Sequence, residues 1–296
     1  MRFLIVAKKE FIDIVSSRRF TALLVTMVIF FLMSILQTLQ STAGGRISTA
    51  PMIGFFGSSS LAFVGGIFGI ALGFDLITRE KESGTLRTLL TRPVFRDEII
   101  IGKAIAAFLA ICVAVAITFL FMLGALTMRY TPSFDDVTNI GKMMFVTIAY
   151  LYTFFSIAFL ISALTKNSST SLTVAMGVFI VLALFLPLFS NYIAQAIVGP
   201  PPENPFWDFR SIGNVSEDPR FRSYLEEMRS YREKVQSITS SLSIFSPVSS
   251  YSTILNSLTA SGYFRTVDIT KNLLSFIIVP IVLFVLAYLR FTREEL

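Results

Sequence analysis

The chain has few side chains that could perform catalysis. Its 296 residues include no His and one Cys, Cys112, which lies in an apolar run and is expected to pack rather than react. This composition excludes Cys/His metal centres, disulfides within the chain and acid/base catalysis by imidazole. No Gly-x-x-x-x-Gly-Lys-Ser/Thr loop is present to bind the phosphates of a nucleotide. We therefore expect no catalytic residue, no metal site and no cofactor in this chain.

The charged side chains that could act on a partner are concentrated in residues 75–103. Five basic residues lie there between two apolar runs: Arg79, Lys81, Arg87, Arg92 and Arg96. A short basic loop beside membrane spans is expected to face the cytoplasm. Ser83 or Thr85 can cap a short helix in this loop, and Pro93 can end it. Three leucines give that helix one apolar face: Leu86, Leu89 and Leu90. Such a helix is suited to binding another protein at the membrane surface.

The overall composition indicates an integral membrane protein. The chain is 54% hydrophobic and 15% charged, whereas soluble domains contain about 25% charged residues. A helical span needs about 20 apolar residues, and the alternating pattern of a membrane barrel is absent. We predict an all-α protein with six transmembrane helices, over about residues 20–40, 52–75, 98–127, 141–164, 170–195 and 272–290.

The distribution of basic residues predicts the orientation of these spans. With six spans, both termini lie on one side, and that side carries fourteen Lys and Arg residues. The short segments on the other side carry three: Arg46, Arg129 and Lys142. We therefore expect cytoplasmic termini in the cell (plasma) membrane. Residues 1–19 precede the first span and have the pattern of an amphipathic helix, which is expected to lie in the membrane interface.

The segment 196–271 is long, polar and predicted to be extracytoplasmic. Its eight basic residues are balanced by eight acidic ones, and long segments cross a membrane regardless of charge. Apolar residues keep a helical spacing from about Phe221 to Leu242, which predicts an amphipathic helix. Residues Tyr251–Leu258 are apolar but too few to span, so we expect them to re-enter the bilayer before the final span and tail, residues 272–296.

The second predicted span carries Gly65, Gly69 and Gly73 on one stripe. Small residues four apart let another helix approach closely, so the stripe predicts a helix-packing seam. The general tolerance of membrane helices for glycine is the alternative explanation.

No ionisable residue lies near the middle of a predicted span. Lys103 and Lys142 lie near span ends and are expected to extend to the interface. Transporters driven by an ion or proton gradient usually need ionisable groups at depth, so a secondary transporter is the least favoured function.

The stretch from Glu82 to Lys103 resembles the signature segment of type-2 permeases of ATP-binding-cassette (ABC) transporters. That pattern reads Glu-x-Gly-Thr-Leu-x-x-Leu-Leu-x-x-Pro-x-x-Arg, followed by Gly-Lys at the start of the third span. Residues 9–20 resemble the interface helix of the family, and residues 162–168 resemble its turn between the fourth and fifth spans. The likeness extends over most of the chain apart from residues 200–243.

The resemblance implies the permease subunit of an ATP-driven exporter, which is not itself an enzyme. It would dimerise with a second permease copy, identical or related, and would bind a cytoplasmic ABC ATPase subunit that holds the ATP. Residues 79–96 would form the coupling helix, and re-entrant helices would precede the last span. The docking residues carried over from the motif are Glu82, Gly84, Thr85, Leu86, Leu89, Leu90, Pro93 and Arg96.

A second function class remains open at this point. The same ATPase docking could move residues 200–270 against an extracytoplasmic partner, so that the chain would be a membrane scaffold or mechanotransmitter and transport nothing. Nucleic acid is not an expected partner, because the basic residues lie beside spans, where membrane lipid accounts for them.

Overall fold

The computed structural model describes residues 2–41, 59–84, 96–127, 134–203, 219–259 and 270–293. Over these residues the regular structure is entirely helical, as predicted. The elements are α1 (Arg2–Val15), α2 (Arg18–Ser41), α4 (Ser59–Gly73), α5 (Thr78–Glu82), α7 (Arg96–Thr127), α8 (Phe134–Leu164), α9 (Ser168–Ile180), the π-helix η1 (Val181–Phe185), α10 (Leu186–Val198), α11 (Pro219–Ser243), α12 (Pro247–Thr259) and α13 (Thr270–Thr292).

Five helical stretches among the described residues are long and apolar enough to cross a membrane. They are Ala62–Glu82, Asp97–Ala125, Val137–Leu164, Ser168–Val198 and Thr270–Thr292. The predicted first span, about residues 20–40, lies in α2, a helix of 24 residues that is not among these five. The structure therefore supports five of the predicted spans and shows the remaining one as a helix.

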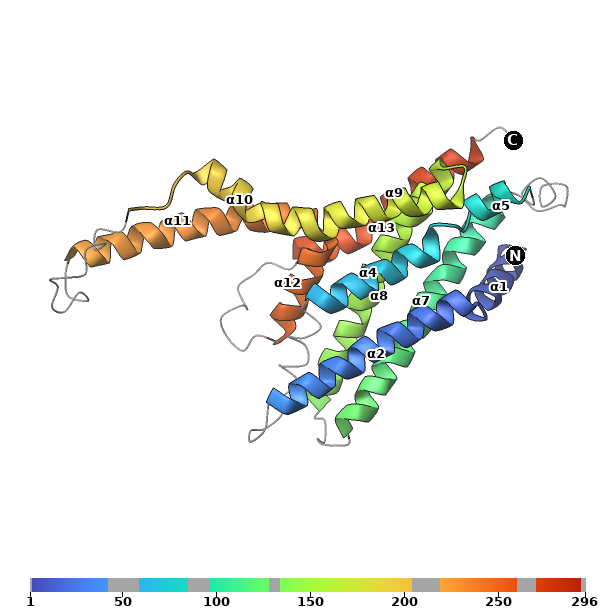
Figure 1. The fold of residues 1–296 in the computed structure, drawn as a ribbon, viewed down its shortest axis with the longest axis horizontal. Helices are drawn as coiled ribbons and strands as arrows, with labels where there is room; N and C mark the ends of the chain where they lie inside the picture. Colours follow the sequence, from blue (N-terminus) through green and yellow to red (C-terminus); the bar gives the residue numbers. More distant parts are fainter. Residues whose placement is uncertain are drawn as a thin grey trace.

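Helix α8 is the centre of the bundle. It packs against α4, α7, α9, α12 and α13 (Figure 1). Four of its aromatic side chains are almost fully buried: Tyr150, Phe154, Phe155 and Phe159. Tyr150 stacks on Tyr251 of α12 with ring centroids 4.4 Å apart, and the Tyr150 hydroxyl donates to the Ala62 carbonyl of α4 at 2.6 Å. The core of the protein is thus organised around one helix.

Helix α4 approaches α8 along the glycine stripe. A Cβ added at Gly69 would lie 2.4 Å from the Leu151 carbonyl oxygen, and one at Gly73 would lie 2.7 Å from that of Phe155. At Gly65 the nearest atom would be the Leu151 Cδ1, at 3.1 Å. Because two of these neighbours are backbone atoms, a side chain could be admitted only by moving one helix away from the other.

Helix α1 lies along α7. A Cβ added at Gly102 of α7 would lie 2.8 Å from the Val6 side chain, so the two helices are in close contact there. On its other side α1 exposes Leu4, Ile5 and Ile12, at 49%, 72% and 50% of their surface. These exposed apolar side chains are suited to the lipid interface where the sequence places this helix.

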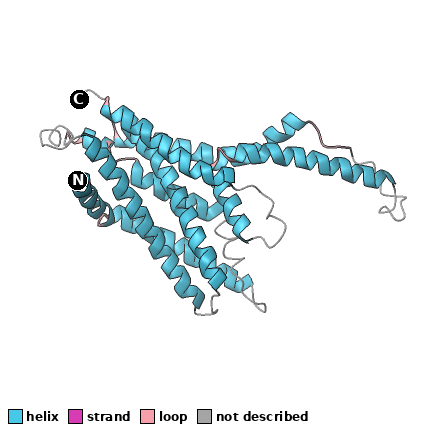
Figure 2. Cartoon of the chain, turned by 180° about the vertical axis from the view of Figure 1, so that it is seen from behind, coloured by secondary structure: helices cyan, strands magenta, loops and turns pink. Residues whose placement is uncertain are grey.

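Helices α10 and α11 form an arm that projects from the bundle, and both views show it (Figures 1 and 2). The amphipathic helix predicted from about Phe221 to Leu242 lies within α11. The predicted re-entrant segment Tyr251–Leu258 lies within α12, which packs against α4, α8 and η1. Helices α1, α5 and the end of α13 lie together at one end of the bundle (Figure 1).

Replacement of Gly69 by Ala is expected to destabilise the protein by about 1–3 kcal/mol, the usual cost of overpacking. The matched control is Gly177→Ala in α9, where no described atom lies within 4 Å of the added Cβ. Thermal unfolding of both variants in the same detergent or nanodisc checks this. Equal midpoints for the two variants would contradict the close approach of α4 to α8.

Candidate coupling site

Residues 74–84, which we call the coupling root, connect α4 to the segment predicted to bind a partner. The α-helix of α4 ends at Gly73, a turn follows over residues 74–77, and α5 begins at Thr78. A turn at this place frees backbone groups that a continuous helix would pair internally. In a mostly apolar bundle these groups need other partners.

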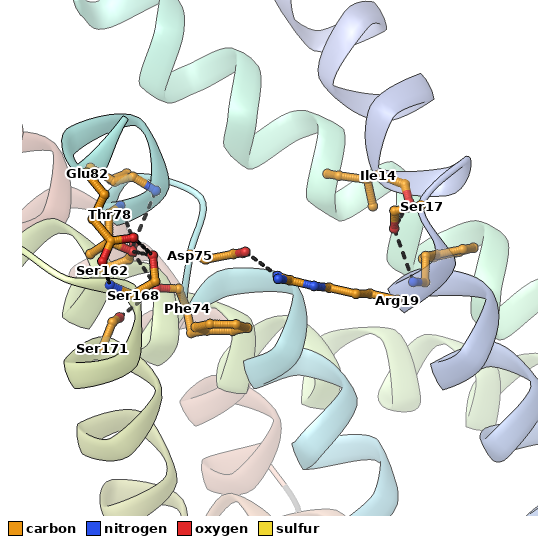
Figure 3. A network of polar contacts seen from close by, with 12 residues as sticks. Ile14, Ser17, Arg19, Phe74, Asp75, Thr78, Glu82, Ser162, Ser168 and Ser171 are labelled. Atoms are coloured by element: carbon orange, nitrogen blue, oxygen red, sulfur yellow. Dashed lines mark hydrogen bonds and ion pairs between the residues drawn. The ribbon is translucent and has the colours of Figure 1, made fainter. Parts of the chain in front are cut away.

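Serines from α8 and α9 supply these partners (Figure 3). The backbone N–H groups of Ile77 and Thr78 both donate to the Ser162 hydroxyl oxygen of α8, each at 3.1 Å. The Phe74 carbonyl accepts from the Ser171 hydroxyl of α9 at 2.6 Å and from the Thr78 hydroxyl at 3.1 Å. Ser162, Ser171 and Thr78 are all buried. The break in the helix is therefore joined to two neighbouring helices.

Two adjacent charges of the coupling root bind opposite ends of those same helices. The Lys81 ammonium donates to the Ala163 carbonyl at 2.9 Å and the Thr165 carbonyl at 3.5 Å, where α8 ends. The Glu82 carboxylate accepts from the backbone N–H and the hydroxyl of Ser168, the first residue of α9, at 2.9 and 2.7 Å. A cation at a helix C-terminus and an anion at an N-terminus each complement the helix dipole. Lys81 and Glu82 thus clasp the turn between α8 and α9.

An ion pair at the start of the coupling root reaches α2. Asp75 pairs with Arg19 (Figure 3), whose guanidinium also lies 5.8 Å from the centre of the Phe74 ring. Ser17 accepts a hydrogen bond from the Phe20 N–H at 3.1 Å and so caps the start of α2 beside this pair. The coupling root is therefore held to the first long helix as well.

A buried charge cluster joins the coupling root to α1 and α7. The Lys103 ammonium lies 3.1 Å from the Glu10 carboxylate of α1 and 2.9 Å from the Glu80 carboxylate of α5. The Lys103 side chain is only 4% exposed, so the expectation that it extends to the interface was wrong. The two carboxylates compensate its charge where burial would otherwise be costly. The second oxygen of Glu80 is buried without a partner among the described residues.

The structure places only some of the predicted docking residues. Glu82 is engaged by Ser168 within the chain, and Gly84 adopts a φ of 67° just after α5, a conformation that favours glycine. Arg96 is the first residue of α7. The others lie outside the described residues: Thr85, Leu86, Leu89, Leu90 and Pro93. Ser83 follows the end of α5, and the helix that it was predicted to cap lies outside the described residues.

Several residues of the site were missed from the sequence. Ser162 and Ser168 lie in the segment that resembles the family's turn, but the sequence did not predict that they or Ser171 bind the coupling root, because each partner is more than 80 residues distant. One feature of the sequence indicated that Lys103 could be paired: it is a lysine inside an otherwise apolar run. Among the described residues no cluster could hold a metal ion. The arrangement bonds the coupling root to α1, α2, α7, α8 and α9 or to residues bonded to them.

Comparisons with known proteins agree with one another. The model of the family described as ABC-2 family transporter protein matches residues 4–296. The chain is also similar to a protein of Stutzerimonas stutzeri named "Probable ABC transporter permease protein NosY". The two are 26% identical over 192 residues, which cover 62% of this chain and 67% of that protein.

Replacement of Ser162 by Ala is expected to lower the stability by about 1–3 kcal/mol, because it leaves two buried N–H groups without an acceptor. Ser156→Ala is the matched control, since the hydroxyl of this buried serine of α8 donates to the Tyr152 carbonyl of its own helix. Hydrogen exchange should show loss of protection at residues 77 and 78 in the first variant alone. Equal exchange in both variants would contradict the assignment.

Replacement of Lys103 by Met is expected to destabilise the protein by about 3–5 kcal/mol, the cost of leaving buried charges unpaired. The triple variant Glu10→Gln, Glu80→Gln, Lys103→Met should recover most of this loss, because no charge then remains in the cluster. Lys142→Met, at an exposed position of α8, is the control. Denaturant titration measures the free energy of unfolding of the single variant, the triple variant and the control. A Lys103→Met variant as stable as the control would rule out the buried cluster.

Proposed function

Because this chain belongs to the ABC-2 family of transporter proteins, we propose that it is the permease subunit of an ATP-driven exporter and that residues 79–96 bind a separate ATPase subunit. Family membership supports the membrane permease role and implies a partner that hydrolyses ATP. The observation that carries the docking role is the anchoring of the coupling root. Side chains and backbone of residues 74–82 are bonded to α2, α7, α8 and α9 at one end of the bundle.

The anchoring gives a route by which the partner could move the membrane helices. Closure of two ATPase subunits on ATP would displace the segment that leaves the coupling root at Gly84. Since Lys81 and Glu82 bind the end of α8 and the start of α9, those helices would follow the displacement. Movement of packed helices as rigid bodies is a common form of such transitions.

The proposal includes an arrangement in the membrane. Helix α2 would be the first of six spans, α1 would lie in the cytoplasmic interface, and both termini would be cytoplasmic in the cell membrane. Two copies of the chain, or this chain and a related one, would enclose the transport route. ATP would be bound only by the partner, and the Glu82–Arg96 segment would supply the docking surface.

A second candidate function is favoured by the arm. Helices α10 and α11 extend beyond the bundle (Figure 1), which suits contact with an extracytoplasmic partner. In this alternative, the chain would be a mechanotransmitter that carries ATP-driven movement across the membrane without transporting a substrate.

Deletion of residues 221–242 separates the two functions. Inside-out vesicles containing the permease and its ATPase would be supplied with fluorescent lipids and amphipathic peptides. Export that persists after the deletion supports the exporter, because the bundle alone then forms the route. ATP hydrolysis without accumulation of any probe, before and after the deletion, favours the mechanotransmitter.

Reversal of charge at Arg96 to Glu is expected to reduce co-purification of the ATPase about tenfold, equivalent to about 1.4 kcal/mol of binding free energy. Candidate ATPases from the source genome, recognised by a phosphate-binding loop, would be co-expressed with the permease. Arg293→Glu, in the turn after α13, is the control for the same change of charge. An unaltered complex with Arg96→Glu would argue against docking through this segment.

Gly84→Pro tests the same docking at the exit from the coupling root. Proline cannot adopt the positive φ of this glycine, so the segment after it should be misdirected while the bundle stays folded. Gly141→Ala in α8, where no described atom lies within 4 Å of the added Cβ, serves as the control. Wild-type levels of ATPase in the Gly84→Pro complex would exclude a docking role for this turn.

A further inference from the structure

The apolar stretch Ser168–Val198 is not one continuous α-helix. Helix α9 passes into the π-helical turn η1, and α10 follows. The Leu186 N–H donates to the Val181 carbonyl, five residues earlier, instead of to that of Leu182. The next residue, Pro187, has no N–H. A π-turn within an α-helix is rare and often lies at a functional site.

The π-turn and the proline together leave the Leu182 carbonyl without a donor in its own helix. In α-helical register its donor would be Leu186, which bonds Val181 instead. In π register its donor would be residue 187, a proline. The Ser246 hydroxyl takes this place and donates to the Leu182 carbonyl at 2.8 Å. Ser246 lies 64 residues away in the chain, so the missing hydrogen bond of the π-turn is supplied by a different element.

Ser246 also fixes the start of α12. Its hydroxyl oxygen accepts from the Ser249 N–H at 3.2 Å, and its carbonyl accepts from the Ser250 N–H at 3.0 Å. Ser246 itself is 0% exposed. It lies between the end of α11 at Ser243 and the start of α12 at Pro247. One buried hydroxyl therefore lies where α10 begins and α11 ends.

The arm beyond this point is a unit of its own. The Tyr231 hydroxyl of α11 donates to the Gly199 carbonyl at the end of α10, at 3.2 Å. The Thr239 hydroxyl lies 3.3 Å from the Asn191 side-chain oxygen of α10. In the described part of the chain, α11 packs mainly on α10, with bonds at Tyr231 and Thr239, and less on α12. The two arm helices are thus joined to each other more extensively than to the bundle.

We propose that η1 is a hinge, that Ser246 is the positioning residue that holds it in the π-helical form, and that α10 and α11 tilt about it as one unit. The bond from the Ser246 hydroxyl to the Leu182 carbonyl connects η1 to the junction of α11 and α12. When it is made, α12 and the base of the arm are held to η1. When it is broken, the Leu182 carbonyl has no donor in its helix and the arm can swing. The proposal does not depend on which partner drives the movement.

Distances between spin labels on the isolated permease in nanodiscs test the hinge. The background is Cys112→Ala, which removes the native thiol, with labels at Lys166 beside the start of α9 and at Ser237 on the arm, both exposed. The wild-type chain is expected to show a narrow distance distribution. Ser246→Ala is expected to broaden the distance distribution, because the hydrogen bond from Ser246 to the Leu182 carbonyl is then lost.

Three further variants complete the test. Adding Pro187→Ala to Ser246→Ala is expected to narrow the distribution again, because the alanine N–H can bond within the helix. Ser246→Thr keeps the hydroxyl and is expected to retain the narrow distribution. The control is Ser190→Ala, since the Ser190 hydroxyl donates to the Pro187 carbonyl of its own helix, and this variant should resemble the wild type.

Two outcomes would overturn the proposal. The first is a Ser246→Ala distribution as narrow as that of Ser190→Ala. The second is a broadened distribution that Pro187→Ala does not restore. If Ser246→Ala does not fold, Pro187→Ala alone is decisive: by restoring the missing N–H within the helix it should shift the mean distance, and an unchanged mean refutes the hinge. No ATPase is present in this experiment, so its failure is distinct from a failure of ATPase docking.

Discussion

The structure depends on the requirement that backbone N–H and C=O groups be hydrogen-bonded where water is absent. Two of the long helices are interrupted, one at the coupling root and one at η1. At each interruption serines from other elements supply the missing partner: Ser162 and Ser171 in one case, Ser246 in the other. What would otherwise be a defect in a helix becomes a specific contact between elements distant in sequence.

These contacts surround a core that is packed quite differently. Helices α4 and α8 meet through glycine against backbone, and aromatic rings fill the space around α8. Such packing admits no intermediate spacing, so this pair should move as a body. The coupling root lies at one end of α4 and α8, and the hinge lies along the neighbouring helix α9 and its continuation. The tightly packed pair of α4 and α8 therefore lies between two sites that are held by serine hydrogen bonds, the coupling root and η1.

The helices could be predicted from the sequence, but the side-chain contacts between them could not. Apolar length and helical spacing predicted α7, α8, α13 and the arm helix α11, because burial and membrane thickness act on each stretch separately. They could not predict that Lys103 would be enclosed by two carboxylates, since Glu10 and Glu80 come from elements whose contact depends on the whole fold. Pro187 indicated a bend, but the π register and its repair by Ser246 depend on an element that follows much later in the chain.

The hydrogen bond between Ser246 and Leu182 sets the free energy that is needed to move the arm. Opening the bond between Ser246 and Leu182 leaves the Leu182 carbonyl without a donor, at a cost of about 1–3 kcal/mol, which is a few times the thermal energy at room temperature. The closed arrangement of the arm is therefore the populated one, and the open arrangement is a minor state. An outside force need only shift the fraction of time spent in each state, so even a weakly binding ligand or a change in the surrounding lipid could set the position of the arm.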